Sequence, residues 1–199
     1  WNPDIYMYDL ATNQEAQVTS NGYGQYNPRI YEDKIVYEDK RNYNPNTGNN
    51  DIFLYDLSTK QEKQITADVY NQQNPSIYGN IIAWSDNRVS KNVNYYDIFM
   101  HDLSTNQDKR VTLSSFYLPG GGAFIKPKVY GGKIVWGNSD ISGYDANGQR
   151  YVSITSDSIV QAGADIFQDQ LQRTAVACAR VDGRLQVLPD FLLVEDRPG

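Results

Sequence analysis

Short runs of β-forming residues alternate with polar turns along most of the chain. Within residues 27–68 the segments NPRIY, KIVYEDK, DIFLYDL and EKQITA are rich in β-branched and aromatic residues, and turn residues separate them. This pattern predicts four short strands, with the polar loop RNYNPNTGNN between the second and the third. No apolar run reaches the length of about 18 residues that a membrane-spanning helix needs, so we expect no membrane insertion.

The third of these strands is apolar on both faces. Ile52 and Leu54 point to one side, whereas Phe53, Tyr55 and Leu57 point to the other. A strand with one face in water would be polar on that face. We therefore expect each small sheet to be packed between two neighbours.

Similar sequence segments recur along the chain. DIYMYDLATNQEAQVTS begins at Asp4, DIFLYDLSTKQEKQITA at Asp51 and DIFMHDLSTNQDKRVTL at Asp97, and KPKVYGGKIVWGNSD opens a further unit at Lys126. Four-stranded units of about 40–45 residues that stack face to face are typical of a β-propeller. The repeat predicts an all-β propeller of four-stranded antiparallel blades.

The repeat NP-x-IYG-x-IIAWSDNR, followed by DIF, DLST and VT, resembles the TolB-like propeller repeat of bacterial and archaeal surface proteins. The resemblance covers residues 1–136 and weakens towards Ser156. It implies an extracellular or cell-surface protein, with a periplasmic location as the alternative. It also implies an interaction module, because such repeats typically serve as binding surfaces.

The blade count depends on the ends of the chain. We expect one propeller domain over residues 1–199, whose five blades are 1–20 with 185–197, 27–69, 74–115, 126–156 and 157–184. Pairing of the terminal strands would close the ring, since LQVLPDFLLVEDRPG aligns with PRIYEDKIVYEDKR. If DIFQDQL at Asp165 is itself a third strand, there are four blades. An incomplete ring is a further alternative, because the composition changes after Tyr151. A closed ring predicts a monomer and an open ring a homodimer.

Charge and histidine content argue against several classes of function. A net charge of −6 argues against nucleic-acid binding. His101 is the only histidine and lies inside a predicted strand, so we expect a packing residue between blades. A likeness to propeller-type oligogalacturonate lyases implies several histidines around a metal, which this chain lacks. We expect no metal and no cofactor; calcium at NPNTGNND is a weak alternative.

Acidic residues end the second strand of each blade, as at Glu38, Asp39, Asp86 and Asp140. A feature that every blade repeats indicates structure, since an active site is one place. We expect Arg41, Arg88 and Arg197 to pair with Asp39, Asp86 and Asp196 or with an adjacent blade, and we expect no catalytic residue. The enzymatic alternative is a glycosidase or lyase that uses a carboxylate pair in the central channel to act on a polysaccharide.

The loops between second and third strands vary most and are rich in Asn and Tyr, which suit carbohydrate or protein contacts. We predict a binding or scaffold module that contacts a protein or glycan partner through loops on one rim. A structural subunit of a surface layer or filament is a further alternative. The candidate binding residues are Arg41, Tyr43, Arg88, Tyr95, Phe116, Tyr117 and Trp136.

Overall fold

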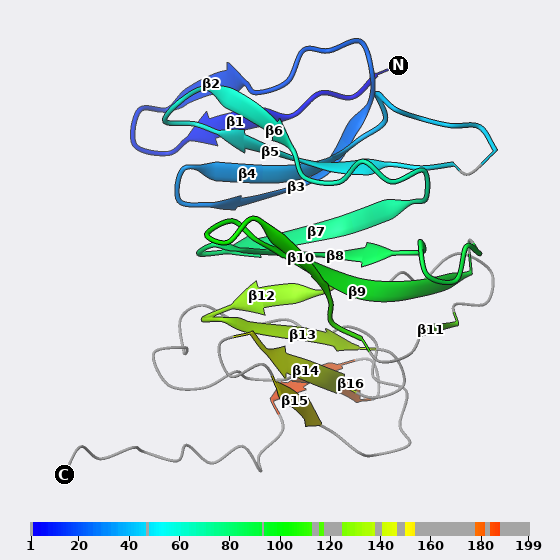
Figure 1. Cartoon of the computed structure of the whole chain (residues 1–199). Coiled ribbons are helices and arrows are strands. Elements are labelled where there is room, and N and C mark those ends of the chain that lie inside the picture. Colours follow the sequence, from blue (N-terminus) through cyan, green and yellow to red (C-terminus); the bar gives the residue numbers. More distant parts are fainter. Residues whose placement is uncertain are drawn as a thin grey trace. The chain divides into compact units, whose positions relative to one another are not determined.

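The computed structural model describes residues 2–46, 48–92, 94–112, 116–117, 125–137, 141–146, 150–153, 178–181 and 184–187. All regular secondary structure in these ranges is β-strand (Figure 1). Within them, no helix has the length and apolar character needed to cross a membrane. The chain divides into two compact units, residues 1–127 and 128–199.

The first unit contains two four-stranded antiparallel sheets with the same strand order. Blade I consists of β3 (Gln25–Tyr31), β4 (Lys34–Asp39), β5 (Asp51–Asp56) and β6 (Gln61–Gln64). Blade II consists of β7 (Gln72–Tyr78), β8 (Ile81–Asp86), β9 (Tyr95–Asp102) and β10 (Gln107–Arg110). These sheets confirm the predicted four-stranded blades.

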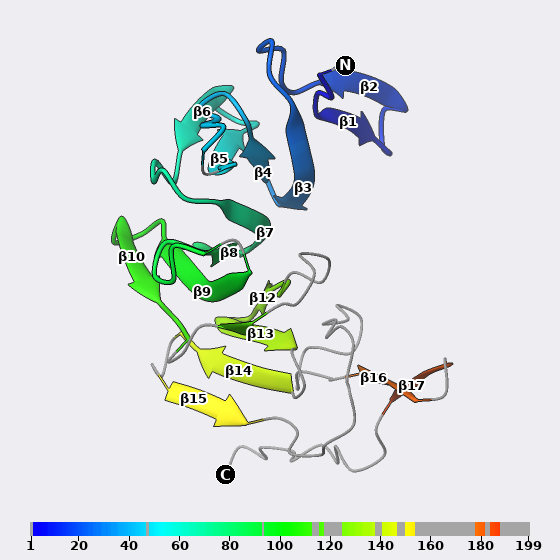
Figure 2. The ribbon, with the colours of Figure 1, turned by 90° about the vertical axis from the view of Figure 1, so that its right-hand side faces the viewer.

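A two-stranded hairpin precedes blade I and a short strand follows blade II. The hairpin pairs β1 (Tyr6–Asp9) with β2 (Gln14–Gln17). Strand β11 (Phe116–Tyr117) pairs with the first two residues of β9. Figure 2 shows the hairpin, blade I and blade II following one another within this unit.

The second unit contains blade III and a second hairpin. Blade III consists of β12 (Lys128–Tyr130), β13 (Lys133–Gly137), β14 (Ile141–Asp145) and β15 (Arg150–Ser153). The hairpin pairs β16 (Cys178–Val181) with β17 (Arg184–Val187). Most of residues 157–199 lie outside the described ranges. The five-blade count, the closed ring and the single domain therefore stay predictions.

Apolar side chains pack on both faces of blade I, as the sequence predicts. Between blades I and II, Ile52 and Leu54 join a buried cluster that includes Val36, Ile77, Ile82, Trp84 and Phe99. On the other face Phe53, Tyr55 and Leu57 pack in a cluster with Ile5 of the hairpin. Neither sheet could bury both faces alone, so stacking is the source of the core.

A threonine-based clamp explains why each repeat ends in VT or IT. The Oγ1 of Thr19, Thr66 and Thr112 accepts a hydrogen bond from the backbone N–H of the isoleucine in the DI motif, at 2.8, 2.8 and 3.2 Å. The backbone N–H of each threonine also donates to the carbonyl of that isoleucine, for example Thr66 to Ile52 at 3.2 Å. The motif therefore fastens the fourth strand to the third.

The innermost strands of blades I and II carry the same irregularity. Asn27 and Asn74 each precede a proline and have positive φ angles of 51° and 53°, a conformation that asparagine tolerates better than most residues. The register of β3 shifts between Tyr26 and Arg29, and that of β7 shifts at the equivalent place. The Asn-Pro pair of the repeat therefore marks a β-bulge.

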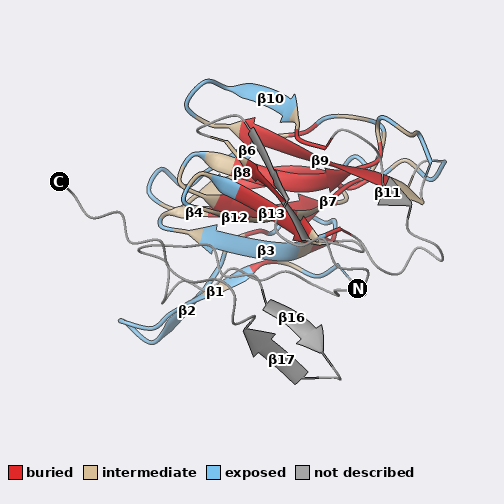
Figure 3. Ribbon diagram, turned by 90° about the horizontal axis from the view of Figure 1, so that it is seen from below, coloured by how far each residue is buried: buried red, intermediate tan, exposed pale blue. Residues whose placement is uncertain are grey.

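Equivalent positions differ sharply in exposure between the two blades. Ile77 of β7 is 6% exposed, whereas Ile30 of β3 is 58% exposed. Tyr6, Tyr8 and Leu10 of the hairpin are 54%, 56% and 86% exposed, although their counterparts in blade I are packed. Figure 3 shows β3 largely exposed beside a largely buried β7. Blade I and the hairpin therefore present an open face.

Candidate functional site

Arg41 and Arg88 each pair with the acid that ends the second strand of their blade. In blade I, Nη2 of Arg41 lies 2.7 Å from Oδ2 of Asp39 and 2.9 Å from Oε1 of Glu62 on β6. In blade II, Nη2 of Arg88 lies 2.6 Å from Oδ2 of Asp86. Both guanidinium groups also lie over the phenylalanine of the DIF motif, Phe53 or Phe99. Of the two predicted alternatives, pairing within the same blade is confirmed for Arg41 and Arg88. Arg197 lies outside the described residues.

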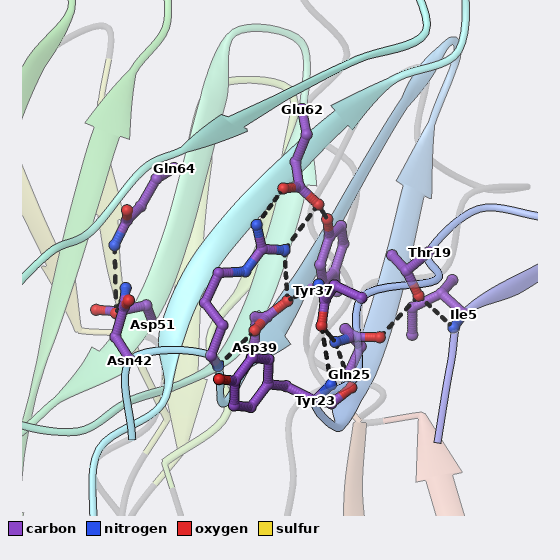
Figure 4. Close-up of polar contacts among 12 residues, drawn as sticks. Ile5, Thr19, Tyr23, Gln25, Tyr37, Asp39, Asn42, Asp51, Glu62 and Gln64 are labelled. Carbon is purple, nitrogen blue, oxygen red and sulfur yellow. Dashed lines mark hydrogen bonds and ion pairs between the residues drawn. The ribbon is translucent and has the colours of Figure 1, made fainter. Parts of the chain in front are cut away.

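Figure 4 shows Tyr37, Asp39 and Glu62 converging in blade I. The Tyr37 hydroxyl donates to Glu62, and burial together with this carboxylate raises the pKa of Tyr37. Burial alone would raise the pKa of Asp39, but hydrogen bonds from Arg41 and Asn21 outweigh it and hold that pKa below its ordinary value. Asp39 therefore stays ionised as the fixed partner of Arg41.

The opposite shift occurs at Asp51, which faces Asp39 across β4 and β5. Burial raises the pKa of Asp51, against the hydrogen bonds that its carboxylate accepts from Asn42 and Thr66. Asp39 and Asp51 are each 1% exposed. Blade II has the same facing pair, Asp86 and Asp97. This carboxylate pair is thus a repeated and buried part of the blade.

Glu38 connects blade I to blade II. Its Oε1 accepts from Asn27 Nδ2 at 2.6 Å and from the backbone N–H of Asn74 at 2.7 Å, and its Oε2 accepts from Asn50 Nδ2 at 2.7 Å. The side chain is buried, and every hydrogen bond shown for its carboxylate comes from a neutral donor. We interpret Glu38 as a residue that links the two blades by hydrogen bonds, in line with the predicted structural role of these acids.

Asparagines fold the loop from Asn42 to Asn50. The Nδ2 of Asn42 donates to Asp51, the Oδ1 of Asn49 accepts from the backbone of Asn44, and the backbone N–H of Asn50 donates to Asn71 of blade II. Asn49 and Asn50 are buried. Within the described residues, no group of three or more His, Cys, Asp or Glu side chains could hold a metal ion.

His101, for which the sequence predicts packing between blades, is a buried residue of β9 in blade II. It is 5% exposed, and its Nδ1 lies 2.7 Å from Oδ1 of Asp108, the residue opposite it on β10. The contact ties two neighbouring strands together.

A concave pocket of about 390 Å³ lies between the segments that flank the hairpin in the sequence and one end of blade I. We call it the tyrosine pocket. Its lining comes from the segment that precedes β1, the connection between β2 and β3, β3 itself, and the residues that follow β4. The lining residues are Asn2, Tyr23, Gly24, Tyr26, Lys40, Arg41 and Tyr43.

Gly24 allows the ring of Tyr26 to lie in the pocket. A Cβ atom on Gly24 would lie 2.7 Å from Cζ of Tyr26, which is closer than real contacts allow. The segment is held by its backbone, because Gln25 N–H donates to Pro3 at 2.7 Å and Lys40 N–H donates to Gly24 at 3.1 Å. A side chain at position 24 would therefore make the Tyr26 ring shift from its place in the pocket.

Lys40 lies between two of the tyrosines. Its Nζ is 4.9 Å from the ring centroid of Tyr26 and 5.9 Å from that of Tyr43. Tyr23 and Tyr43 are 52% and 51% exposed, so their rings are accessible from solvent. The pocket thus combines aromatic faces, phenolic hydroxyls and an ammonium group.

The tyrosine pocket departs from the repeat. Its residues Gly24, Tyr26, Lys40 and Tyr43 stand where blade II has Asn71, Gln73, Asn87 and Ser90. In blade II the backbone N–H of Asn71 donates to Asn87 Oδ1 at 2.7 Å, and Asn71 Oδ1 accepts from Asn50. Amide contacts therefore take the place that the lysine and the aromatic rings hold in blade I. The fold therefore does not require these four residues of the pocket.

The candidate binding residues from the sequence fall in different places. Arg41 and Tyr43 line the tyrosine pocket, and Arg88 is paired within blade II. Tyr95 begins β9, and Phe116 and Tyr117 pair with that end of β9 as β11. Trp136 on β13 is 3% exposed and belongs to the second unit. The structure thus brings Arg41 and Tyr43 together in the tyrosine pocket, and it places Phe116 and Tyr117 beside Tyr95 on paired strands.

Sequence reasoning missed Asn2, Tyr23, Gly24, Tyr26 and Lys40. The signal was present, because three of these positions break the repeat, but it lies in strand and turn residues instead of in the variable loops. Tyr23 has a tyrosine counterpart in blade II, Tyr70, and gave no such signal.

No protein-family model matches the chain, and no match was found among curated proteins. Among solved structures the chain is similar to TolB from Acinetobacter baumannii, with a TM-score of 0.60 and 21% identity, over 92% of this chain and 45% of that one. It is also similar to an oligogalacturonate lyase in complex with manganese, with a TM-score of 0.57 and 12% identity, over 94% of this chain and 54% of that one. The chain spans about half the length of these proteins. The likenesses show a TolB-like propeller fold.

Proposed function

We propose that the chain is a non-catalytic binding module of an exported or cell-surface protein, and that it binds a glycan in the tyrosine pocket. The observation that carries the proposal is the break in the repeat. The same positions of blade II carry other residues and still form a blade, so Gly24, Tyr26, Lys40 and Tyr43 are free to serve a ligand. Function is expected where one blade differs from the others.

The chemistry of the pocket suits a sugar. Sugar rings present apolar faces that pack on aromatic rings, and hydroxyls that exchange hydrogen bonds with groups such as tyrosine Oη. Tyr23 and Tyr43 expose about half of their surface, and the Tyr26 ring lies close to Gly24. A volume of about 390 Å³ also falls within the range of ligand pockets.

The buried state of the acids supports a binding role over catalysis. A glycosidase needs two carboxyl groups that face the substrate. Asp39, Asp51 and Glu38 are each less than 4% exposed and already accept hydrogen bonds from neighbouring side chains. The tyrosine pocket is lined by no acid. These observations favour a module that holds a ligand without transforming it.

The test is binding of the purified chain to an array of neutral and acidic oligosaccharides, followed by titration calorimetry of the best ligand. The variant Tyr43→Ala should weaken binding by about threefold to tenfold, the amount expected from loss of one stacked ring. Tyr8→Ala is the matched control, because Tyr8 is 56% exposed but outside the pocket. If the folded chain bound no glycan, the glycan assignment would be wrong and a protein ligand would become the leading alternative.

A further inference from the structure

We infer that the tyrosine pocket selects an acidic glycan, one whose sugar rings carry a carboxylate, and that Lys40 recognises this carboxylate. The inference rests on the proposed glycan binding and names the chemical class of the ligand. It starts from charge. The chain as a whole carries 24 acidic and 18 basic residues, yet the pocket is lined by two cations and no acid.

The two cations differ in how far their charge is already neutralised. Arg41 contacts both Asp39 and Glu62, and its guanidinium lies 4.0 Å from the centroid of Phe53. Lys40 forms no ion pair with any carboxylate in the described part of the chain; the contacts shown for its ammonium are with Tyr26 and Tyr43. Lys40 therefore supplies the uncompensated positive charge of the pocket.

The fold does not need this charge. Asn87 occupies the position of Lys40 in blade II, where its amide oxygen accepts a hydrogen bond from the backbone N–H of Asn71. A lysine at this point of blade I thus needs another explanation, and a ligand anion supplies one. Attraction between an ammonium and an anion is also stronger beside aromatic rings than in open water, because the rings exclude solvent from one side.

The arrangement explains why a sugar acid fits better than a free anion. The carboxylate of a hexuronate projects from the edge of the ring. A ring that stacks on Tyr43 or Tyr26 would therefore direct its edge, with the carboxylate, towards the ammonium that lies between these tyrosines. The aromatic rings would bind the sugar face, and Lys40 would select the acid.

A matched pair of ligands separates charge from shape. The β-1,4-linked glucuronate hexamer and cellohexaose differ only in the oxidation state of C6, so titration of the whole chain with each isolates the contribution of the carboxylates. We expect tighter binding of the glucuronate hexamer. We also expect its affinity to fall as NaCl is raised from about 50 to about 500 mM, because salt screens the ion pair, while binding of cellohexaose changes little.

Variants of Lys40 test the assignment directly. Lys40→Met keeps the apolar stem and should lower affinity for the glucuronate hexamer by at least about tenfold, the loss expected for a charged hydrogen bond. Its affinity for cellohexaose should stay within about twofold, because the neutral sugar makes no charged contact. Lys40→Arg should restore most of the binding. Lys60→Met, at an exposed turn between β5 and β6, is the control.

The outcomes distinguish the inference from the proposed function. If both hexamers bind with the same affinity and Lys40→Met binds them like the parent chain, the selection of acids is wrong and glycan binding stands. If neither hexamer binds, the selection of acidic glycans and the proposed glycan binding are both wrong for β-1,4-linked glycans of this size. Loss of both ligands in Lys40→Met would also contradict the inference, because it would assign the lysine to the shape of the pocket.

Discussion

The guanidinium of Arg41 lies 4.0 Å from the ring centroid of Phe53 while it pairs with Asp39, so one side chain connects an aromatic ring of β5 to the carboxylate that ends β4. Arg88 and Phe99 repeat the relationship in blade II at 4.6 Å. The planar guanidinium can stack and pair at once, which a lysine ammonium cannot do. The arginine of the repeat is therefore a part of the blade.

Arg41→Ala should lower the free energy of unfolding by about 3 kcal/mol, because it leaves the buried carboxylate of Asp39 without its cation. Arg41→Lys should recover only part of this loss, since it keeps the charge and loses the stacking. Urea denaturation measures both. Arg29→Ala is the control, because Arg29 is exposed on β3. Equal stability of Arg41→Ala and the parent chain would contradict the structural role of the arginine.

Gly24→Ala should disturb the tyrosine pocket, because the added methyl group would collide with the ring of Tyr26. We expect lower affinity for the glycan ligand and a changed NMR signal from Tyr26. Gly22→Ala is a close control, because a Cβ at that position meets nothing within 4 Å. Wild-type affinity in Gly24→Ala would mean that the position of the Tyr26 ring does not matter for binding.

Two facing acids should respond oppositely to pH. The pKa of Asp39 is lowered in the folded state, so its contribution to stability is present above its ordinary value of 3.8 and is lost as pH falls through the lower folded pKa. The pKa of Asp51 is raised, so its ionisation lowers stability, an effect that is absent below 3.8 and complete above the folded pKa.

Asp39→Asn should therefore be most destabilising near pH 7 and less so below pH 3.8. The loss of unfolding free energy in Asp51→Asn, relative to the parent chain, should be smallest near neutral pH. This loss should grow as the pH falls. Urea titrations of the three proteins between about pH 2.5 and pH 7 would measure these trends, a span that brackets both ordinary carboxyl pKa values. Parallel curves for the two variants would show that the environments of the two acids do not differ as described.

Equivalent isoleucines in two blades should differ in importance. Ile77→Ala removes a side chain that is 6% exposed and lies in the cluster between blades I and II, so it should cost about 3 kcal/mol. Ile30→Ala should change stability by less than about 1 kcal/mol, because Ile30 is 58% exposed. Thermal unfolding of both variants measures the difference. A large loss in Ile30→Ala would show that this face is covered in solution.

The repeat made the fold predictable and the site hard to see. Alternation in DIFLYDL correctly predicts which residues face each neighbour, because strand geometry sends Ile52 and Phe53 to opposite sides. The acid–arginine pairs were also visible, since their spacing is fixed along one strand end. The tyrosine pocket was missed, although Gly24, Tyr26 and Lys40 break the repeat. A local pattern does not show that these positions meet Asn2 and Tyr23, because that depends on long-range contacts.

The open face of the β1–β2 hairpin should make the hairpin open locally more often than the blades beside it. In a stack of repeats each sheet is stabilised by its neighbours, so a sheet that is packed on one side opens more readily than one packed on two. Tyr6, Tyr8 and Leu10 are more than half exposed, whereas Phe53 is 3% exposed. Amide hydrogens of Tyr6 to Asp9 should therefore exchange with solvent before those of β5. Because Asn2 and Tyr23, on either side of this hairpin in the sequence, line the tyrosine pocket, a bound ligand should slow that exchange.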